Sequence, residues 1–204
     1  MNNQEESLAA LQEIRNLMER SSRFLLLSGI AGVVVGLLAL AGVVMAYVSL
    51  GLSIGSVGYY TLIPQNYGLL FANFGSLLVL SLLAGFFFAR RNAQKQALPV
   101  WDRTAARLSI NMFIPLAVGG IFCLLVLYHG YTALAAPITL IFYGLALINA
   151  SKYSIDDIRY LGLLEVLVGL LATFFIEYGL LFWAVGFGLL HIVYGMVIYL
   201  KYEK

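Results

Sequence analysis

Charged residues are scarce in this chain of 204 residues, since Asp, Glu, Lys and Arg make up 11% of it and hydrophobic residues 62%. A soluble domain usually carries about 25% charged residues. Too few charges are present to cover a water-facing surface, which excludes a soluble globular enzyme as well as a disordered or fibrous chain. The composition predicts an all-α membrane protein that crosses the bilayer several times.

Cysteine and histidine are also rare. Cys123 is the only cysteine, so no disulfide forms within the chain. His129 and His191 are too few for the histidine-rich iron sites of membrane oxygenases. The net charge of +2 is too small to predict binding of nucleic acid. No phosphate-binding loop, nucleophile–base arrangement or metal-spacing motif occurs, so we expect neither an enzyme nor a cofactor or metal.

Long apolar runs are what the chain has in abundance. A bilayer core about 30 Å thick is crossed by about 20 apolar residues in a helix. We therefore predict a transmembrane domain over 24–204, with three in-out-in hairpins at 24–89, 108–150 and 160–201. The six predicted spans are Phe24–Val48, Tyr67–Phe88, Ile110–Leu127, Ala133–Asn149, Leu161–Ile176 and Leu180–Leu200.

The 12 Lys and Arg residues all fall on one side of this six-span topology. They lie in the N-terminal arm, in the second-to-third and fourth-to-fifth connections, and in the C-terminal tail. By the positive-inside rule, both termini are expected in the cytoplasm. Helical spans with this bias are typical of a bacterial cytoplasmic (inner) membrane and not of an outer membrane, where barrels dominate. The lipid bilayer is therefore the first expected partner.

Residues 1–23 form a mostly polar arm before the first apolar run. Apolar side chains recur in this arm at helical spacing, which predicts an amphipathic helix on the cytoplasmic side. Such a helix either lies along the membrane or the cytoplasmic loops, or docks on a cytoplasmic partner or on a second copy of the chain. The side chains expected to make that contact are Leu8, Leu11, Ile14 and Met18.

The second and third hairpins show internal similarity. Residues 115–153 align with residues 164–202 without a gap, and the run Val35–Ala39 recurs as Val168–Ala172. We interpret the hairpins as parallel repeats, with chance matches among common Gly and Leu residues as the alternative. Parallel repeats differ from the inverted repeats that build many secondary transporters.

The segment Leu11–Phe24 reads LQEIRNLMERSSRF and runs into a first span that contains serine and glycine. It resembles a family of uncharacterised bacterial multispan membrane proteins that begin in this way. The cadence of the hairpins, with Gly-Leu-Leu-Ala at Gly169–Ala172, is similar to that of the HdeD-type acid-resistance membrane proteins. The first resemblance implies a multispan membrane fold, and the second is one of pattern that carries no function across.

Small residues recur at helical spacing in the first, fifth and sixth predicted spans. Small side chains let membrane helices approach closely, so these stripes are expected to face protein and not lipid. If the fifth and sixth spans form a tight antiparallel hairpin, their two stripes face each other. The glycines expected at helix contacts are Gly32, Gly36, Gly162, Gly169, Gly188 and Gly195.

Glu165 and His191 are the ionisable members of the last two stripes. Counting outward from the turn between these spans places both at about the same depth, within side-chain reach. A hydrogen bond between them would lower the cost of a charge in hydrocarbon. Either the pair fixes the register of the hairpin, or it is a site for proton sensing, proton relay or ligand binding. A metal site is disfavoured because two ligands are too few.

Three classes of function remain open from the sequence. The small-residue stripes and the arm favour a non-catalytic membrane protein that acts by association or in a stress response. The Glu165–His191 pair favours a proton-coupled or pH-gated transporter or channel, and it is also the only support for an intramembrane enzyme. The polar residues expected to make hydrogen bonds between helices are Asn73, Ser76, Asn111 and Asn149.

Overall fold

The computed structural model describes residues 11, 28–50, 63–95 and 101–204, and all regular structure in these residues is helical. The prediction of an all-α protein is therefore confirmed. Short 3-10 turns connect several helices at Thr132–Leu134 (η1), Ser151–Tyr153 (η2) and Ile176–Tyr178 (η3). The other elements are α2 (Gly29–Leu50), α4 (Ile63–Lys95), α5 (Arg103–Tyr128), α6 (Ala135–Ala150), α7 (Asp157–Phe174), α8 (Gly179–Trp183), a π-helical segment η4 (Ala184–Leu190), α9 (His191–Ile198) and a π-helical turn η5 (Tyr199–Glu203).

Five helical stretches in the described residues are long and apolar enough to cross a membrane. The fifth predicted span, Leu161–Ile176, falls on α7, which has 18 residues and carries Asp157, Arg159 and Glu165. Three charges in so short a helix set α7 apart from the other five. The stretches are Gly29–Ser49, Gly68–Lys95, Arg103–Tyr128, Thr132–Tyr153 and Ile176–Glu203.

The predicted amphipathic arm over 1–23 lies outside the described residues, except for Leu11, which is helical and exposed. The contact residues Leu8, Ile14 and Met18 predicted for a partner also lie outside them.

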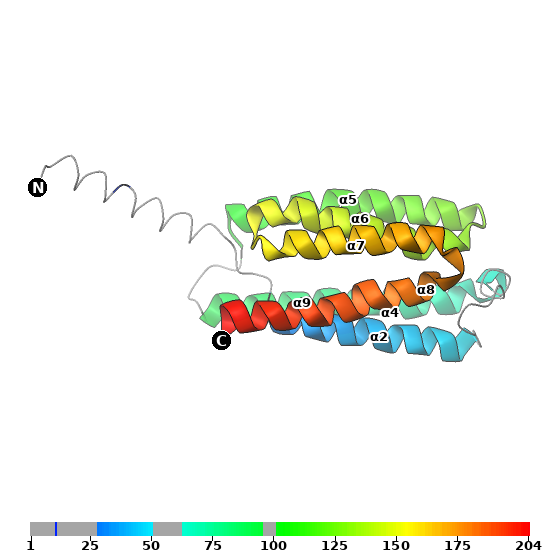
Figure 1. Cartoon of the computed structure of the whole chain (residues 1–204), viewed down its shortest axis with the longest axis horizontal. Helices are drawn as coiled ribbons and strands as arrows, with labels where there is room; N and C mark the ends of the chain where they lie inside the picture. Colours follow the sequence, from blue (N-terminus) through cyan, green and yellow to red (C-terminus); the bar gives the residue numbers. More distant parts are fainter. Residues whose placement is uncertain (1–10, 12–27, 51–62, 96–100) are drawn as a thin grey trace, which may run out of the picture.

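The long helices form two layers, one with α2, α4 and α9 and the other with α5, α6 and α7 (Figure 1). In one layer α2 packs against both α4 and α9, and in the other α6 packs against both α5 and α7. The segment α8 crosses from the end of α7 to the beginning of η4 and α9, so the last two predicted spans belong to different layers. The beginnings of α2, α5 and α7 and the ends of α4 and α9 all lie at the left end of the bundle in Figure 1.

The contact between α2 and α9 depends on glycine. A Cβ atom on Gly195 would lie 2.6 Å from the carbonyl oxygen of Gly29, and one on Gly36 would lie 2.6 Å from the carbonyl oxygen of Gly188. A Cβ atom on Gly32 would lie 3.1 Å from the Cα atom of Gly195. The neighbours are backbone atoms that cannot turn aside, so only the absence of a side chain permits this approach.

The contact between α6 and α7 is built in the same way. A Cβ atom on Gly162 would lie 2.7 Å from the carbonyl oxygen of Gly144, and one on Gly169 would lie 2.7 Å from the side chain of Ile141. The stripe on α7 therefore faces α6, and the stripe on α9 faces α2. The prediction that the two stripes face each other is wrong for their glycines, because counting from a turn gives a residue's depth but not the direction of its face.

Asparagine side chains join neighbouring helices within each layer. The side-chain N–H of Asn73 on α4 donates to the carbonyl oxygen of Gly42 on α2 at 3.0 Å. The side-chain N–H of Asn149 on α6 donates to the carbonyl oxygen of Asn111 on α5 at 2.9 Å. The side-chain oxygen of Asn111 also accepts from Asn149 at 3.4 Å, so the prediction of hydrogen bonds between helices is confirmed for the three asparagines. The prediction is wrong for Ser76, whose hydroxyl donates to the carbonyl oxygen of Asn73 within α4 at 2.8 Å.

Candidate functional site

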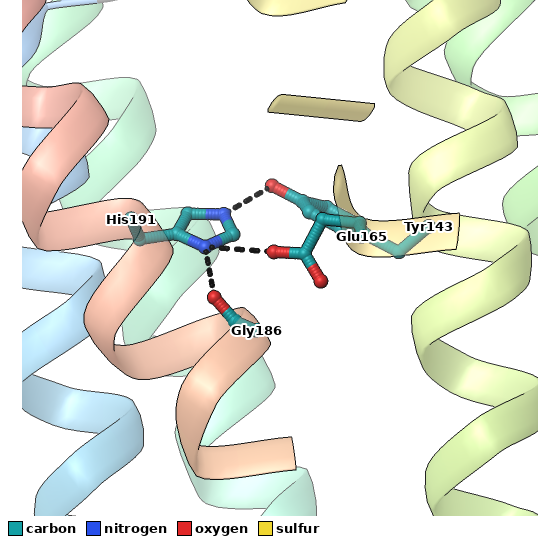
Figure 2. A network of polar contacts seen from close by, with 4 residues as sticks. All are labelled: Tyr143, Glu165, Gly186 and His191. Carbon is teal, nitrogen blue, oxygen red and sulfur yellow. Dashed lines mark hydrogen bonds and ion pairs between the residues drawn. The ribbon is translucent and has the colours of Figure 1, made fainter. Parts of the chain in front are cut away.

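Glu165 lies midway along α7 and is 0% exposed. The glycines of α7 hold this helix against α6, while the carboxylate reaches toward the other layer and meets His191 at the start of α9 (Figure 2). His191 is 5% exposed. The distance between His191 Nδ1 and Glu165 Oε1 is 3.3 Å. The structure thus brings together the two ionisable residues singled out in the sequence, and it does so across the boundary between the layers.

His191 has a partner on each ring nitrogen. Its Nδ1 atom lies 3.1 Å from the carbonyl oxygen of Gly186 in η4, and its Nε2 atom lies 2.8 Å from the hydroxyl oxygen of Tyr143 on α6. Figure 2 shows the imidazole held between these groups, with Glu165 and Tyr143 coming from one layer and His191 and Gly186 from the other. Four residues from the four elements α6, α7, η4 and α9 therefore form one polar cluster.

The partners of the imidazole decide where its protons lie. A carbonyl oxygen only accepts a hydrogen bond, so Nδ1 carries a proton that it donates to Gly186 and directs toward Glu165. Tyr143 then has two choices: its hydroxyl donates to Nε2 when the ring is neutral, or accepts from Nε2 when the ring is an imidazolium. Tyr143 therefore fits both protonation states of His191.

The carboxylate of Glu165 is poorly satisfied. Neither Oε1 nor Oε2 has a hydrogen-bond partner within the part of the chain that the structure describes, although both atoms are buried. The contact with His191 is an ion-pair distance and does not meet hydrogen-bond geometry. Buried polar groups in folded proteins are nearly always hydrogen-bonded, because an unpaired one costs free energy. This carboxyl group is an exception to that rule.

Gly186 gives the site its local geometry. It lies in the π-helical segment η4, five residues before the histidine that donates to its carbonyl oxygen. A Cβ atom on Gly186 would lie 2.5 Å from Glu165 Oε2 and would also contact the side chain of Leu140. Glycine thus leaves room for the carboxylate. Short π-helical segments inside helices occur frequently at functional sites.

Aromatic rings close the cluster on the side toward α8. Trp183, Phe187 and His191 follow each other at four-residue spacing, with ring centroids 4.7 Å apart for the first two and 5.9 Å apart for the last two. The ring of Tyr143 lies 4.9 Å from that of Phe187 and 5.4 Å from that of His191. This stack separates the polar cluster from that end of the bundle.

An apolar cluster closes the opposite side. It joins both layers, since Ile198 of α9 packs with residues of α6 and α7, and Tyr143, Leu190 and Tyr194 pack against it. Its other buried members are Leu147, Ile155, Ile158 and Leu161. The polar cluster is thus enclosed along the bundle by aromatic rings on one side and by aliphatic side chains on the other.

Tyr143 and Gly186 were missed in the sequence analysis. Each stands in an apolar run, where a tyrosine or glycine carries no special pattern. Tyr143 joins the site only because of how the layers meet, whereas Gly186 joins it through a local contact with His191. The occurrence of Gly186 five residues before the buried histidine is the one feature that could have drawn attention to it. Among the described residues, no group of three or more His, Cys, Asp or Glu side chains is placed to hold a metal ion.

Comparison with protein-family models, with curated proteins and with solved structures found no match to this chain.

Proposed function

We propose that this chain is a multispan membrane protein in which Glu165 and His191 form a proton-binding site that couples protonation to transport or gating. The observation that carries this proposal is the fully buried carboxylate of Glu165, which has no hydrogen-bond donor on either oxygen among the described residues and lies beside a buried imidazole. Ionisable residues at membrane depth commonly serve as proton relays in pumps and transporters.

The topology that accompanies this proposal has six spans, with α7 as the fifth, in three in-out-in hairpins after the amphipathic arm. The charges of α7 support its place inside the protein, because Glu165 faces the other layer and Asp157 lies before the apolar part that begins at Leu161. We place both termini in the cytoplasm of a bacterium. In support, the described basic residues lie in helix ends at one end of the bundle or in the adjoining η2: Arg90, Arg91, Lys95, Arg103, Arg107, Lys152, Arg159, Lys201 and Lys204.

Proton counting explains how the pair would work. With only the Nδ1 proton present, His191 is neutral and Glu165 carries a buried negative charge. One more proton, on Glu165 or on Nε2, makes the pair neutral overall. An uncompensated charge in hydrocarbon is costly. The pair with a net negative charge therefore favours an arrangement that water can reach, whereas the neutral pair favours a dry one. Protonation thereby shifts the balance between a closed and an open arrangement of the layers.

A purely structural role makes the opposite predictions. A polar pair retained for register alone is expected to be fully hydrogen-bonded, since a partly satisfied network stabilises less than apolar packing. Replacing Glu165 would then lower the stability of the protein without changing proton flux. The proton-binding role instead predicts that a neutral residue at this position maintains or raises stability while function is lost.

The test uses purified protein in liposomes, with proton flux followed by an internal pH-sensitive dye. We expect flux that falls at least tenfold in Glu165→Gln and in His191→Phe. Glu177→Gln, which removes an exposed carboxylate near the turn beside α8, is the matched control and retains flux. Infrared difference spectra across a pH step should also show a carboxyl band that Glu165→Gln removes. Equal flux in wild type and Glu165→Gln, or a band that persists in this variant, refutes the proposal.

A further inference from the structure

The last turn of the chain contacts both layers. Within η5, the Lys201 Nζ atom donates to Asp157 Oδ2 at 2.8 Å, and the Tyr202 hydroxyl donates to the same oxygen at 3.0 Å. Asp157 is the first residue of α7. Two side chains of the C-terminal turn thus hold the beginning of a helix in the α5–α7 layer.

The next residue of the same turn binds the other layer. The carboxylate of Glu203 accepts a hydrogen bond from the backbone N–H of Gly29 at 2.5 Å and one from the hydroxyl of Ser28 at 3.3 Å. These groups lie at the beginning of α2, where free N–H groups and the helix dipole favour a negative charge. Lys201, Tyr202 and Glu203 together form what we call the C-terminal clamp.

The clamp lies at the end of the seam between α7 and α9. Moving inward from it, the seam passes the apolar cluster around Ile158 and Ile198 and reaches Glu165 and His191. Asp157 and Glu165 are eight residues apart on α7, which corresponds to about 12 Å along the helix. Any water that reached the pair from this end would pass the clamp and then the apolar cluster.

The opposite end of the seam is closed in a different way. There the chain itself crosses between the layers through α8, where Leu180 packs with Val43 and Ala46 of α2 and Gly179 lies against Ala136 of α6. That end is fixed by covalent continuity and packing. At the clamp end the chain also passes from one layer to the other, between α4 and α5, but α7 meets η5 there through side-chain contacts with Asp157, and these contacts can break without loss of secondary structure.

We propose that the C-terminal clamp is a latch: its contacts with Asp157 and with the beginning of α2 keep the α7–α9 seam closed, and their release admits water toward the Glu165–His191 pair from the clamp end. The latch goes beyond the proton-binding role, since it concerns the accessibility of the seam whether or not the pair carries protons. It makes Asp157 and Glu203 positioning residues that act through the packing of the layers.

Thiol accessibility tests the latch directly. Ile198→Cys places a reporter in the buried cluster between the clamp and the pair, in a Cys123→Ala background so that no other thiol is present. The full-length protein is held in lipid nanodiscs, which expose both faces, and the rate of reaction with a charged methanethiosulfonate is measured. Because an exposed ion pair contributes little, we expect Asp157→Asn and Glu203→Gln each to raise this rate by about two- to fivefold.

Two controls separate release of the latch from general loosening. Asp157→Glu keeps the carboxylate and should retain the slow rate. A second reporter, Val43→Cys, lies in the cluster beside α8 and should react equally slowly in all variants. The proposal is overturned if the reaction rate of the thiol at position 198 is unchanged in both Asp157→Asn and Glu203→Gln. It is also overturned if the rate at position 43 rises as much as the rate at position 198. The increase in reaction rate at position 198 should persist when Glu165→Gln is added to each variant. The proposal of a latch is therefore tested independently of the proposal of a proton-binding site.

Discussion

The backbone N–H of Gly29, at the start of α2, donates a hydrogen bond to the carboxylate of Glu203, which lies 174 positions further along the chain. The helix α2 is therefore capped by residue 203 of the 204 in this sequence. Capping side chains usually come from the residues just before the helix they cap. Here the cap comes from another helix and also joins α2 to the C-terminal turn.

Removal of this cap should destabilise the fold. We expect Glu203→Ala to lower the free energy of unfolding by about 1 kcal/mol, the usual contribution of a capping group near a helix N-terminus. Thermal unfolding in detergent provides the measurement. Glu177→Ala, which removes an exposed carboxylate at the other end of the bundle, should change stability by less than about 0.5 kcal/mol. Equal losses in the two variants would contradict the capping role.

The close approach of α2 and α9 predicts intolerance of a methyl group at Gly195. A Cβ atom there meets backbone atoms of α2 on two sides, including the N atom of Val33 at 2.6 Å. Gly195→Ala should therefore destabilise the protein by about 2 kcal/mol, since overpacking against rigid neighbours typically costs 1–3 kcal/mol. Gly85→Ala on α4 is the control, because nothing lies within 4 Å of its Cβ position. Denaturation by a graded series of SDS concentrations should separate the two variants.

Substitution of Gly186 should disturb the polar cluster before it disturbs the fold. In Gly186→Ala, the new methyl group competes with Glu165 Oε2 and with Leu140, and both are side-chain neighbours that can shift. We expect the carboxylate to move away from His191 and the histidine ring resonances to change in NMR spectra of labelled protein. Gly120→Ala on α5, where the Cβ position is open, should leave these resonances unchanged. A Gly186→Ala spectrum identical to that of wild type would show that the glycine has no such role.

The hydroxyl of Tyr143 is expected to contribute through His191 alone. Tyr143→Phe removes the 2.8 Å hydrogen bond to Nε2 and retains the ring contacts with Phe187. A buried hydrogen bond typically contributes about 1 kcal/mol, so the free energy of unfolding should fall by that amount. If the hydroxyl also helps to hold the imidazolium, the pH at which proton flux is half-maximal should shift. Tyr160→Phe, at an exposed position, is the control and should change neither the free energy of unfolding nor the pH of half-maximal flux. A loss of stability with no shift in the pH profile would limit Tyr143 to a structural role.

The ion pair at the clamp predicts a specific dependence of stability on pH. Hydrogen bonds from Lys201 and, to a smaller extent, from Tyr202 lower the pKa of Asp157, although partial burial opposes this change. Since the pKa in the folded protein is below the value of about 3.9 in an unfolded chain, this contribution is complete above about pH 5 and is lost as the pH falls through the folded pKa. Unfolding curves between about pH 6 and pH 2 should show this loss in wild type but not in Asp157→Asn.

The magnitude of that pH effect is limited by exposure. The side chain of Lys201 is 54% exposed and that of Asp157 is 20% exposed, so water and salt screen the pair. The difference between wild type and Asp157→Asn should therefore become smaller at high salt. A difference that increases above neutral pH would have the wrong sign for a carboxyl group with a lowered pKa.

The sequence by itself determined the secondary-structure class and the depth of the candidate site. Long apolar runs with few charges leave helices as the structure that satisfies every backbone group in lipid, which is why the all-α prediction is confirmed. Depth follows from the fixed rise of a helix, so counting residues from the turn between α7 and α9 placed Glu165 and His191 at one level.

Only the tertiary structure decided which helices are neighbours. The glycines of α7 contact α6 and those of α9 contact α2, because a small residue packs on whichever helix lies opposite, and sequence spacing does not specify that helix. Tyr143 and Glu203 could not be predicted for the same reason, and Gly186 was missed although its partner is local. Their partners are 48, 174 and 5 positions away, and the two long-range contacts arise only when the helices assemble into layers. Periodicity along one helix thus fixes a face and a level, whereas the partner of that face depends on how the whole chain packs.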